Sequence, residues 1–403
     1  MSLTDAQIRN TLRLVFLILL LDVVGISILW PVAAFIVRQY SDSAIMLTLL
    51  TALYSAAQFF AAPAMGRFGD RWGRRPVLIA SLVGSAVGYL LFGLGGALWV
   101  LMLSRLIDGI TAGNQSVAAA VIADVSTPQT RARNFTFFGM AWGLGIIIGP
   151  ALGAALGQWH LAAPAYLAAA LSLLAAIISL KVMPETLPEA QRDTRPLRGA
   201  DLNPFTAIFG FMRRPVLGRS LLVLCLFNFT FNGYNSTEGL YLLDRFHVQP
   251  WQIGALLALA GLALFSLQRI VPPLVARFGG RRVASFSLLA LAVFVLATWL
   301  TPVFAGLYLV VALRTAAGGL VFPTLGALMS SQVQPREQGA LMGVNAALAS
   351  AMTIFGPLWA GAVYDRVSPG APYWMGAILL LFTAAILFGV REAAARPSGP
   401  PAA

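Results

Sequence analysis

The chain has 403 residues, of which 59% are hydrophobic and 10% are charged, and its mean hydropathy is +0.80. One soluble core could not bury this much apolar surface, so the composition excludes an ordinary soluble domain and indicates a protein that crosses a membrane many times. The net charge of +12 would also fit a nucleic-acid-binding protein, but most of the 27 basic residues lie in alternate loops between apolar runs and at the termini. That is the positive-inside pattern of a membrane protein, so we expect no nucleic-acid partner.

Twelve apolar segments follow one another along the chain. Most are longer than twenty residues and none alternates with the period of a barrel strand, so we expect membrane-spanning helices and an all-α membrane protein. The segments are expected near residues 11–37, 44–65, 76–97, 99–123, 134–157, 161–182, 217–243, 252–275, 283–300, 303–330, 339–363 and 373–390.

A charged, proline-rich stretch, residues 184–216, separates the sixth segment from the seventh and is predicted to be a cytoplasmic linker. It divides the chain into an N-terminal six-helix half, 1–183, and a C-terminal six-helix half, 217–392, with a disordered tail at 393–403. Because basic residues mark the cytoplasmic side, both termini are expected in the cytoplasm and the protein in the inner cell membrane.

The two halves share motifs. Residues 63–75 read PAMGRFGDRWGRR and residues 273–282 read PLVARFGGRR, so the second copy lacks the equivalents of residues 70–72. Two further motifs recur: Arg105-x-x-x-Gly109 with Arg314-x-x-x-Gly318, and Gly149-Pro150 with Gly356-Pro357. A parallel repeat of six plus six helices, with a site near the midplane between the halves, is a transporter architecture.

Several ionisable residues lie inside the predicted spans, where such groups are costly and tend to face a cavity or a partner. They are Asp22, Arg105, Asp108, Glu238, Arg269 and Arg314. Apart from Arg269, they fall on the first, fourth, seventh and tenth spans, which predicts one shared cavity. Asp22, Asp108 and Arg314 each lie about ten residues, roughly 15 Å, into a span and therefore near mid-membrane.

These charges suggest a proton-coupling site at Asp22, Arg105, Asp108 and Glu238. Asp22 is predicted as the first proton carrier and Glu238 as the second, because a membrane acid can take a proton from one side and release it to the other. Asp22 could instead make an interhelical hydrogen bond in its protonated form, and Arg105 with Asp108 could be a structural ion pair. Two arginines against three acids leave one negative charge, which one proton or one cationic drug group would neutralise.

Neutral polar residues at membrane depth extend the predicted cavity. Asn228, Asn232 and Asn235 share one helix face at positions i, i+4 and i+7, where they could line the cavity or join two helices. The full set of predicted substrate-cavity residues is Gln58, Asn114, Gln115, Asn228, Asn232, Asn235, Arg314 and Asn345, with Gln268 also at depth.

The arginine-rich stretch 66–78 is predicted to be a tight cytoplasmic loop. Asp70 and Arg74 can pair across this turn, and Asp124 at the end of the fourth span is a plausible third member. Together with Gly66, Arg71 and Gly73 they are predicted to form a latch that holds the two halves together when the outer side is open.

The same loop residues resemble the signature between helices 2 and 3 of the major facilitator superfamily: Gly66, Asp70, Arg71, Gly73, Arg74 and Arg75. Arg105 with Gly109 resembles its helix 4 motif. The run Gly145-x-x-x-Gly149-Pro150-x-x-Gly153 is similar to the helix 5 motif of its drug and proton antiporters, with Ala154 where a glycine is usual.

Within that superfamily the chain looks most like the tetracycline-efflux branch, in the stretch 105–124 and in Asp22-x-x-Gly25. This resemblance implies a proton-coupled exporter of amphipathic drugs that works by alternating access. Tetracycline antiporters carry an acid within helix 3, where this chain has Gly88, and another in helix 9, where residues 283–300 contain none.

Other features narrow the energy source. There is no G-x-x-x-x-G-K-[ST] loop, Lys181 is the only lysine, and His160 and His247 fall in predicted outer loops. We therefore expect neither an enzyme nor an ATP-driven pump, no cofactor and no metal site. The expected partners are a small-molecule substrate, protons and the lipid bilayer, with the protein a monomer. A proton-coupled importer of a sugar or organic acid is the alternative.

Overall fold

The computed structural model describes residues 5–127, 129–192, 211–267, 270–330, 332–334 and 337–389. Twelve spans are long and apolar enough to cross a membrane, and all regular structure in these ranges is helical. The prediction of an all-α fold with twelve spans is confirmed. The central part of the predicted linker and the predicted C-terminal tail lie outside the described residues.

The helices fall into two groups along the chain. The N-terminal half comprises α1 (Asp5–Ser27), α2 (Trp30–Arg38), α3 (Ala44–Trp72), α4 (Arg74–Leu94), α5 (Leu98–Thr111), α6 (Asn114–Asp124), α7 (Arg131–Gly157) and α8 (Ala163–Val182). The C-terminal half comprises α10 (Pro215–Phe246), α11 (Pro250–Leu267), α12 (Val271–Phe278), α13 (Gly280–Leu300), α14 (Phe304–Ser330), α15 (Gln338–Arg366) and α16 (Ala371–Phe388). A short 3₁₀ turn, η1 (Glu189–Gln191), follows α8.

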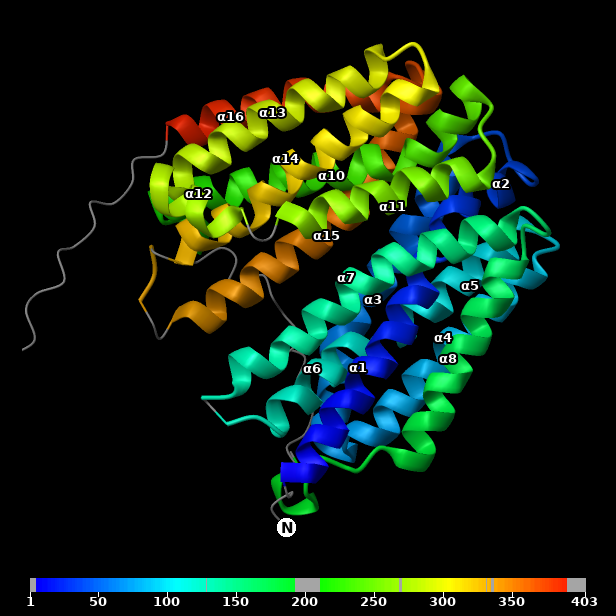
Figure 1. Ribbon diagram of the computed structural model, residues 1–403, viewed down its shortest axis with the longest axis vertical. Coiled ribbons are helices and arrows are strands. Elements are labelled where there is room, and N and C mark those ends of the chain that lie inside the picture. The colour runs from blue at the N-terminus through cyan, green and yellow to red at the C-terminus, as the bar shows by residue number, and fades with distance from the viewer. Residues whose placement is uncertain are drawn as a thin grey trace, which may run out of the picture.

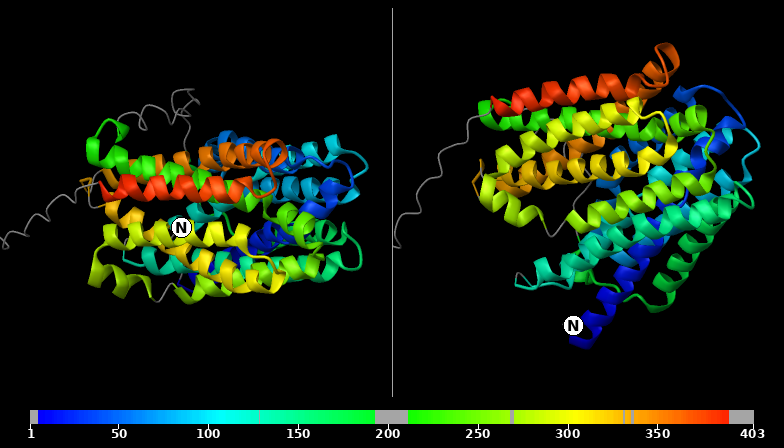
Figure 2. Two further views of the ribbon diagram at one scale, coloured as in Figure 1. Left: turned by 90° about the horizontal axis from the view of Figure 1, so that it is seen from above. Right: turned by 45° about the horizontal axis from the view of Figure 1, so that its top comes forward.

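The two halves form separate bundles that meet at one end of the molecule (Figure 1). Helices α4 and α8 lie at the outer edge of one bundle, and α13 and α16 at the outer edge of the other (Figures 1 and 2). Contacts between the halves join α3 to α15, α7 to α11, and α2 to α10. The ribbons converge at the end where α2 lies and diverge toward the end where α1 begins (Figure 1).

In the first half, two spans that the sequence predicted as continuous each consist of two helices. The first span changes from α1 to α2 just before Pro31, which has no N–H to continue the helical ladder. The fourth span changes from α5 to α6 at Ala112 and Gly113. At Gly113 a Cβ would lie 2.6 Å from Met65 Cβ, so glycine lets α3 approach closely at the break.

The arginine-rich stretch 66–78 is almost entirely helical, which corrects the prediction of a loop. Helix α3 continues to Trp72 and α4 begins at Arg74, so the turn consists of Gly73 alone. Gly73 has φ +103°, a value that favours glycine, and a Cβ there would lie 2.4 Å from Glu185 Oε2. The second half repeats this turn at Gly279, with φ +82°.

Candidate functional site

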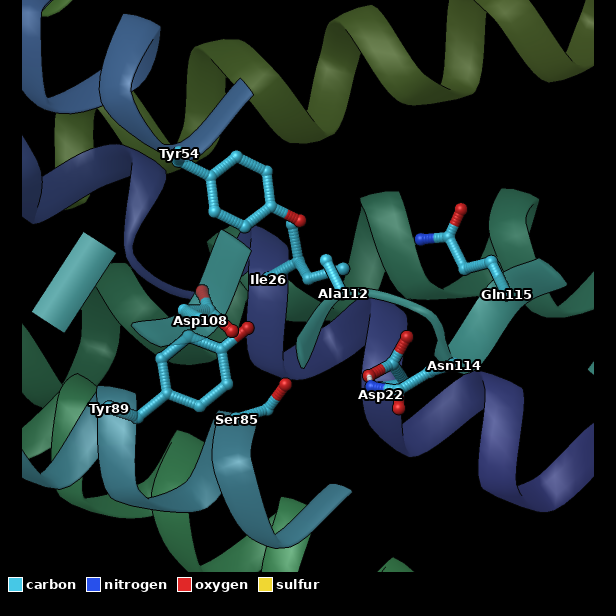
Figure 3. A pocket seen from close by; sticks show the side chains of 9 residues that line it. All are labelled: Asp22, Ile26, Tyr54, Ser85, Tyr89, Asp108, Ala112, Asn114 and Gln115. Carbon is cyan, nitrogen blue, oxygen red and sulfur yellow. Dashed lines mark hydrogen bonds between the residues drawn. The ribbon is translucent and has the colours of Figure 1, made fainter. Parts of the chain in front are cut away.

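A small polar pocket lies at the break between α5 and α6 (Figure 3). Its cavity volume is about 10 Å³, close to the space that one water molecule needs. Side chains from four spans line it: Asp22, Ile26, Tyr54, Ser85, Tyr89, Asp108, Ala112, Asn114 and Gln115. The structure therefore brings together four residues that the sequence singled out, namely Asp22, Asp108, Asn114 and Gln115.

Asp22 is held by the first residue of α6. Its Oδ1 accepts a hydrogen bond of 2.7 Å from Asn114 Nδ2, and both side chains are buried. The other oxygen, Asp22 Oδ2, has no hydrogen-bond partner among the described residues, and neither has Asn114 Oδ1. Since α6 presents its positive N-terminal end here, the helix break itself gives this carboxyl a favourable neighbour.

Asp108 lies opposite, beside Tyr89 (Figure 3). Arg105 Nη1 lies 3.2 Å from Asp108 Oδ2, which makes an ion pair by distance, although the geometry gives that oxygen no hydrogen bond. The Arg105 guanidinium also lies 4.7 Å from the centre of the Phe92 ring. The predicted pairing of Arg105 with Asp108 is therefore present, and it stands at the edge of the pocket that holds Asp22.

Gly88 leaves little room for a side chain on α4 at this pocket. A Cβ at Gly88 would lie 3.0 Å from Asp108 Cβ and 3.1 Å from the Ser104 carbonyl oxygen, because α4 and α5 pack closely here. The second carboxyl of the pocket thus comes from α5, at Asp108, in the space that a longer side chain on α4 would enter.

Glu238 and Arg314 pair with each other inside the C-terminal half. Arg314 Nη2 donates hydrogen bonds of 2.6 and 2.7 Å to the two Glu238 oxygens, and the two side chains are 3% and 8% exposed. The guanidinium also lies 4.9 Å from the centre of the Tyr234 ring. The sequence did not predict this pairing, and the role of Glu238 as a second proton carrier stays a prediction. A buried charge is far less costly when it is paired, and α10 and α14 are adjacent.

The asparagine face of α10 is graded in exposure, with Asn228 buried, Asn232 half-buried and Asn235 exposed. Each side-chain amide donates to the backbone oxygen four residues earlier, at 2.9, 2.8 and 2.7 Å. These bonds lie within α10, so in the described residues they do not join two helices. The amide oxygens remain the groups that a substrate could use.

The other predicted cavity residues are dispersed. Gln58 on α3 is half-buried and lies 3.5 Å from the Tyr54 hydroxyl. Asn345 on α15 has a buried Oδ1 without a hydrogen-bond partner in the described chain. Gln268 and Arg269 lie outside the described residues. The structure therefore places Asn114 and Gln115 in the pocket and Gln58 outside its lining, and it leaves the second-half candidates spread over α10, α14 and α15.

The arginine-turn cluster consists of Asp70, Arg74, Asp124 and Glu185. Arg74 lies 2.6 Å from Asp70 and 3.1 Å from Asp124, as the sequence predicted. Glu185, which no sequence motif indicated, accepts hydrogen bonds from the first two backbone N–H groups of α4, at 2.9 and 3.1 Å. Asp70, Arg74 and Asp124 belong to the N-terminal half, and Glu185 follows shortly after the end of α8. A role of the cluster as a latch between the halves stays a prediction, for the conformation in which the outer side is open.

Gly66 and Arg71 take no part in this cluster. Nothing lies within 4 Å of a Cβ built at Gly66, and Arg71 is exposed.

The two halves are held together at the other end by a closing network of Arg38, Asp244, Tyr364 and Asp365 with the start of α3. Arg38 and Tyr364 both bond to the Asp244 carboxylate, the tyrosine at 2.6 Å. Asp365 accepts bonds from the Ala44 N–H at 2.8 Å and the Ile45 N–H at 3.1 Å, and from the Ser43 hydroxyl. The sequence did not predict this network, because acids at span ends carry no spacing that identifies a partner in the other half.

Helix α7 packs its predicted glycine motif against the first span. A Cβ would lie 2.6 Å from Val23 Cγ1 if added at Gly145, and 1.9 Å from the Ile28 carbonyl oxygen if added at Gly153. A Cβ at Gly149, between these two glycines, would lie 1.9 Å from Ser27 Oγ. The Ser27 hydroxyl donates a hydrogen bond of 2.9 Å to the Gly145 carbonyl oxygen. Pro150 and Ala154 face α11 instead, at Gly254. The motif thus sets the packing on both sides of α7.

Twelve spans in two bundles, with buried carboxyls at a broken helix near the middle of one bundle, define a membrane transport protein and not an enzyme. The chain belongs to the Major Facilitator Superfamily, whose family pattern matches residues 15–272 and 221–403.

Named relatives agree with this assignment. The tetracycline resistance protein, class B, of Escherichia coli is 31% identical over 391 residues, which are 94% of each chain. The class C protein of Escherichia coli is 33% identical over 373 residues, or 91% of this chain and 92% of that protein. The crystal structure of the human organic anion transporter MFSD10 (TETRAN) is 25% identical, with a TM-score of 0.69 over 94% of this chain and 99% of that chain.

Proposed function

We propose that the protein is a proton-coupled secondary transporter that exports amphipathic drugs, tetracycline-like or of a broader range, by alternating access. The observation that carries this proposal is the pocket in which Asp22 and Asp108 share one small cavity at the break between α5 and α6. The names of the bacterial relatives, which are tetracycline resistance proteins, support the class of substrate.

The charges of the molecule fit an exchange mechanism. Because Glu238 and Arg314 neutralise each other, the remaining charge at membrane depth in the described chain comes from Asp22, Asp108 and Arg105. Two carboxylates against one guanidinium leave one negative charge, which either a proton or a cationic group of a drug neutralises. A drug and a proton that compete for one charge are coupled in opposite directions across the membrane.

Asp22 is the proposed proton carrier. Among the described residues its Oδ2 is buried without a donor, and leaving a carboxylate oxygen in that state is costly unless a proton or a cation binds. Asn114 donates to the other oxygen, so it holds the carboxyl in place while Oδ2 exchanges its proton. Asp108 and Arg105 would then set how readily that proton leaves.

The proposed orientation follows from the arginines of the α3–α4 turn, which the positive-inside rule assigns to the cytoplasm. Both termini would then be cytoplasmic and the protein would reside, as a monomer, in the inner membrane. The closing network would lie on the outer side, so the described conformation would face inward and be ready to accept a drug from the cytoplasm.

The test is efflux of a panel of cationic, zwitterionic and neutral drugs from energised cells, with and without a protonophore. Asp22→Asn keeps the size of the side chain but removes the titratable proton, so uphill efflux should be abolished and downhill exchange partly retained. Asp42→Asn is the matched control, since the Asp42 side chain is fully exposed at the closed end. Uphill transport at the normal rate by Asp22→Asn would contradict the assignment.

A second candidate is proton-coupled uptake of an organic acid. It is favoured by the likeness to a human organic anion transporter and by Arg105, whose Nη2 is buried without a partner in the described residues. Uptake of a carboxylate with protons, together with no protection of a drug-sensitive host against any drug of the panel, would support this candidate against the exporter.

A further inference from the structure

A second hollow lies far from the polar pocket, between α12, α13 and α14 in the C-terminal half. Its volume is about 380 Å³, within the range of roughly 300–1,000 Å³ that is usual for small-ligand sites. Apart from Ser287 and Arg282 its lining is hydrophobic: Leu274, Phe278, Val283, Phe286, Ala290, Ala317 and Leu320. We refer to it as the α12–α14 groove.

The groove opens on the outer surface of the bundle. Helix α13 packs on α12, α14 and α16, and it lies at the edge of the molecule that is farthest from the N-terminal half (Figure 1). Phe286 and Val293, seven residues apart on α13, are 62% and 59% exposed. Residues seven apart share one helix face, so this face of α13 lies on the outside of the bundle, where we expect lipid.

One end of the groove is positively charged. Arg282 lines it directly at the first turn of α13, and Arg277 at the end of α12 stacks on Phe278, 5.2 Å from the ring centre. The sequence contains no aspartate or glutamate between Asp244 and Glu337, so these helices supply no acid to neutralise the arginines.

The repeated turn in the first half is different. There Arg74 is paired with Asp70 and Asp124, and Glu185 caps the start of α4. The second half keeps the glycine turn, and within the described residues Arg282 makes no ion pair, so the positive charge of Arg282 can pair with an anion from outside the chain.

From the groove and its charge we propose that an anionic phospholipid binds here, with an acyl chain in the α12–α14 groove and its phosphate at Arg282. An apolar groove that runs to a basic end at the membrane surface matches a lipid with an anionic headgroup. A cationic drug would be repelled by the arginine, and a free phosphate would leave the apolar part of the groove unused. The proposal does not depend on the transported substrate, and only the choice of leaflet depends on the orientation proposed above.

The experiment is native mass spectrometry of the purified full chain in detergent, titrated with dioleoyl phosphatidylglycerol or with dioleoyl phosphatidylcholine. We expect tighter binding of the anionic lipid. Arg282→Gln should weaken it about fivefold, the effect of one arginine near a lipid surface, and leave the zwitterionic lipid nearly unchanged. Arg131→Gln removes one exposed positive charge at the same end of the other half and should change neither affinity by more than about twofold.

A second variant tests the apolar part of the site. Ala290→Trp places a large ring in the groove without changing any charge, so it should weaken binding of both lipids. Arg282 is exposed, so Arg282→Glu provides a surface change that keeps the test decisive if the tryptophan variant does not fold.

Equal affinities for the two lipids, with no effect of Arg282→Gln or Arg282→Glu, would overturn the proposal. Displacement of the anionic lipid by inorganic phosphate would also overturn it, because the site would then be a headgroup site in which the groove plays no part.

Discussion

Removing the Asp365 carboxylate should open the closed end of the molecule. This side chain belongs to α15 in the C-terminal half, yet it caps α3 in the N-terminal half through the Ala44 and Ile45 N–H groups and the Ser43 hydroxyl. A helix cap of this kind contributes about 0.5–2 kcal/mol. Here that free energy stabilises the conformation in which this end is closed, because Asp365 lies on one half and the helix that it caps, α3, lies on the other.

The expected change follows from that magnitude. A loss of about 1–2 kcal/mol changes an equilibrium ratio by roughly 5–30-fold, so Asp365→Ala should raise the fraction of open molecules by that factor. Asp365→Asn keeps one acceptor oxygen and should have a smaller effect.

The assay uses a single cysteine placed at Ala34, with Cys225→Ser as background. Ala34 is 2% exposed, and its Cβ lies 3.2 Å from the position of a Cβ at Gly239 in the other half. A membrane-impermeant maleimide therefore reacts only when this end opens, and the labelling rate reports the open fraction. Asp42→Ala is the control, since it removes an exposed acid that only touches Arg38 at the same end.

Equal labelling rates in Asp365→Ala and Asp42→Ala would refute the reasoning, because the cap would then not contribute to closure. A pair of cysteines at Ala34 and Gly239 gives an independent check, since the Cβ separation is close to the 3.5–4.5 Å of a disulfide. Oxidation of that pair should stop transport, and a reductant should restore it.

Three further predictions concern residues described above. Asp70→Asn should impair transport more than Arg277→Gln, because only Asp70 belongs to a paired cluster; equal defects in a transport assay would count against this. Glu238→Gln should lower the free energy of unfolding by about 3–5 kcal/mol and reduce transport of all drugs alike, because it leaves Arg314 buried without its partner. The double variant Glu238→Gln/Arg314→Met should be more stable than the single variant. Normal stability with a loss of transport for cationic drugs only would indicate instead that Glu238 binds substrate. Gly153→Ala should reduce folded yield sharply, since its Cβ would meet the Ile28 carbonyl oxygen at 1.9 Å, and a normal melting temperature would disprove that contact.

The sequence was sufficient to predict the fold class and four of the nine residues that line the first-half pocket. The apolar runs predicted twelve spans, and Asp22, Asp108 and Asn114 were selected because polar groups at membrane depth are expensive. The pairing of Glu238 with Arg314 was not predicted, since the sequence says that both are buried but not which faces of α10 and α14 meet. Asp365 was missed because acids at span ends are common, and only the packing of α15 on α3 gives this one a partner.

The glycine face of α7 has a consequence for how the molecule can move. On one side α7 lies so close to α1 and α2 that backbone touches backbone, as at Gly153 and Ile28. On its other side it meets α11, where a Cβ at Gly254 would lie 2.2 Å from Ala154 Cβ and a Cβ at Gly261 would lie 2.9 Å from Ile147 Cγ1. Because α7 and the first span belong to the same half, we expect them to move together when the halves separate, so that the contact between α7 and α11 is the one that changes. One side of α7 thus fixes the helix within its own half, and the other side forms a contact between the halves.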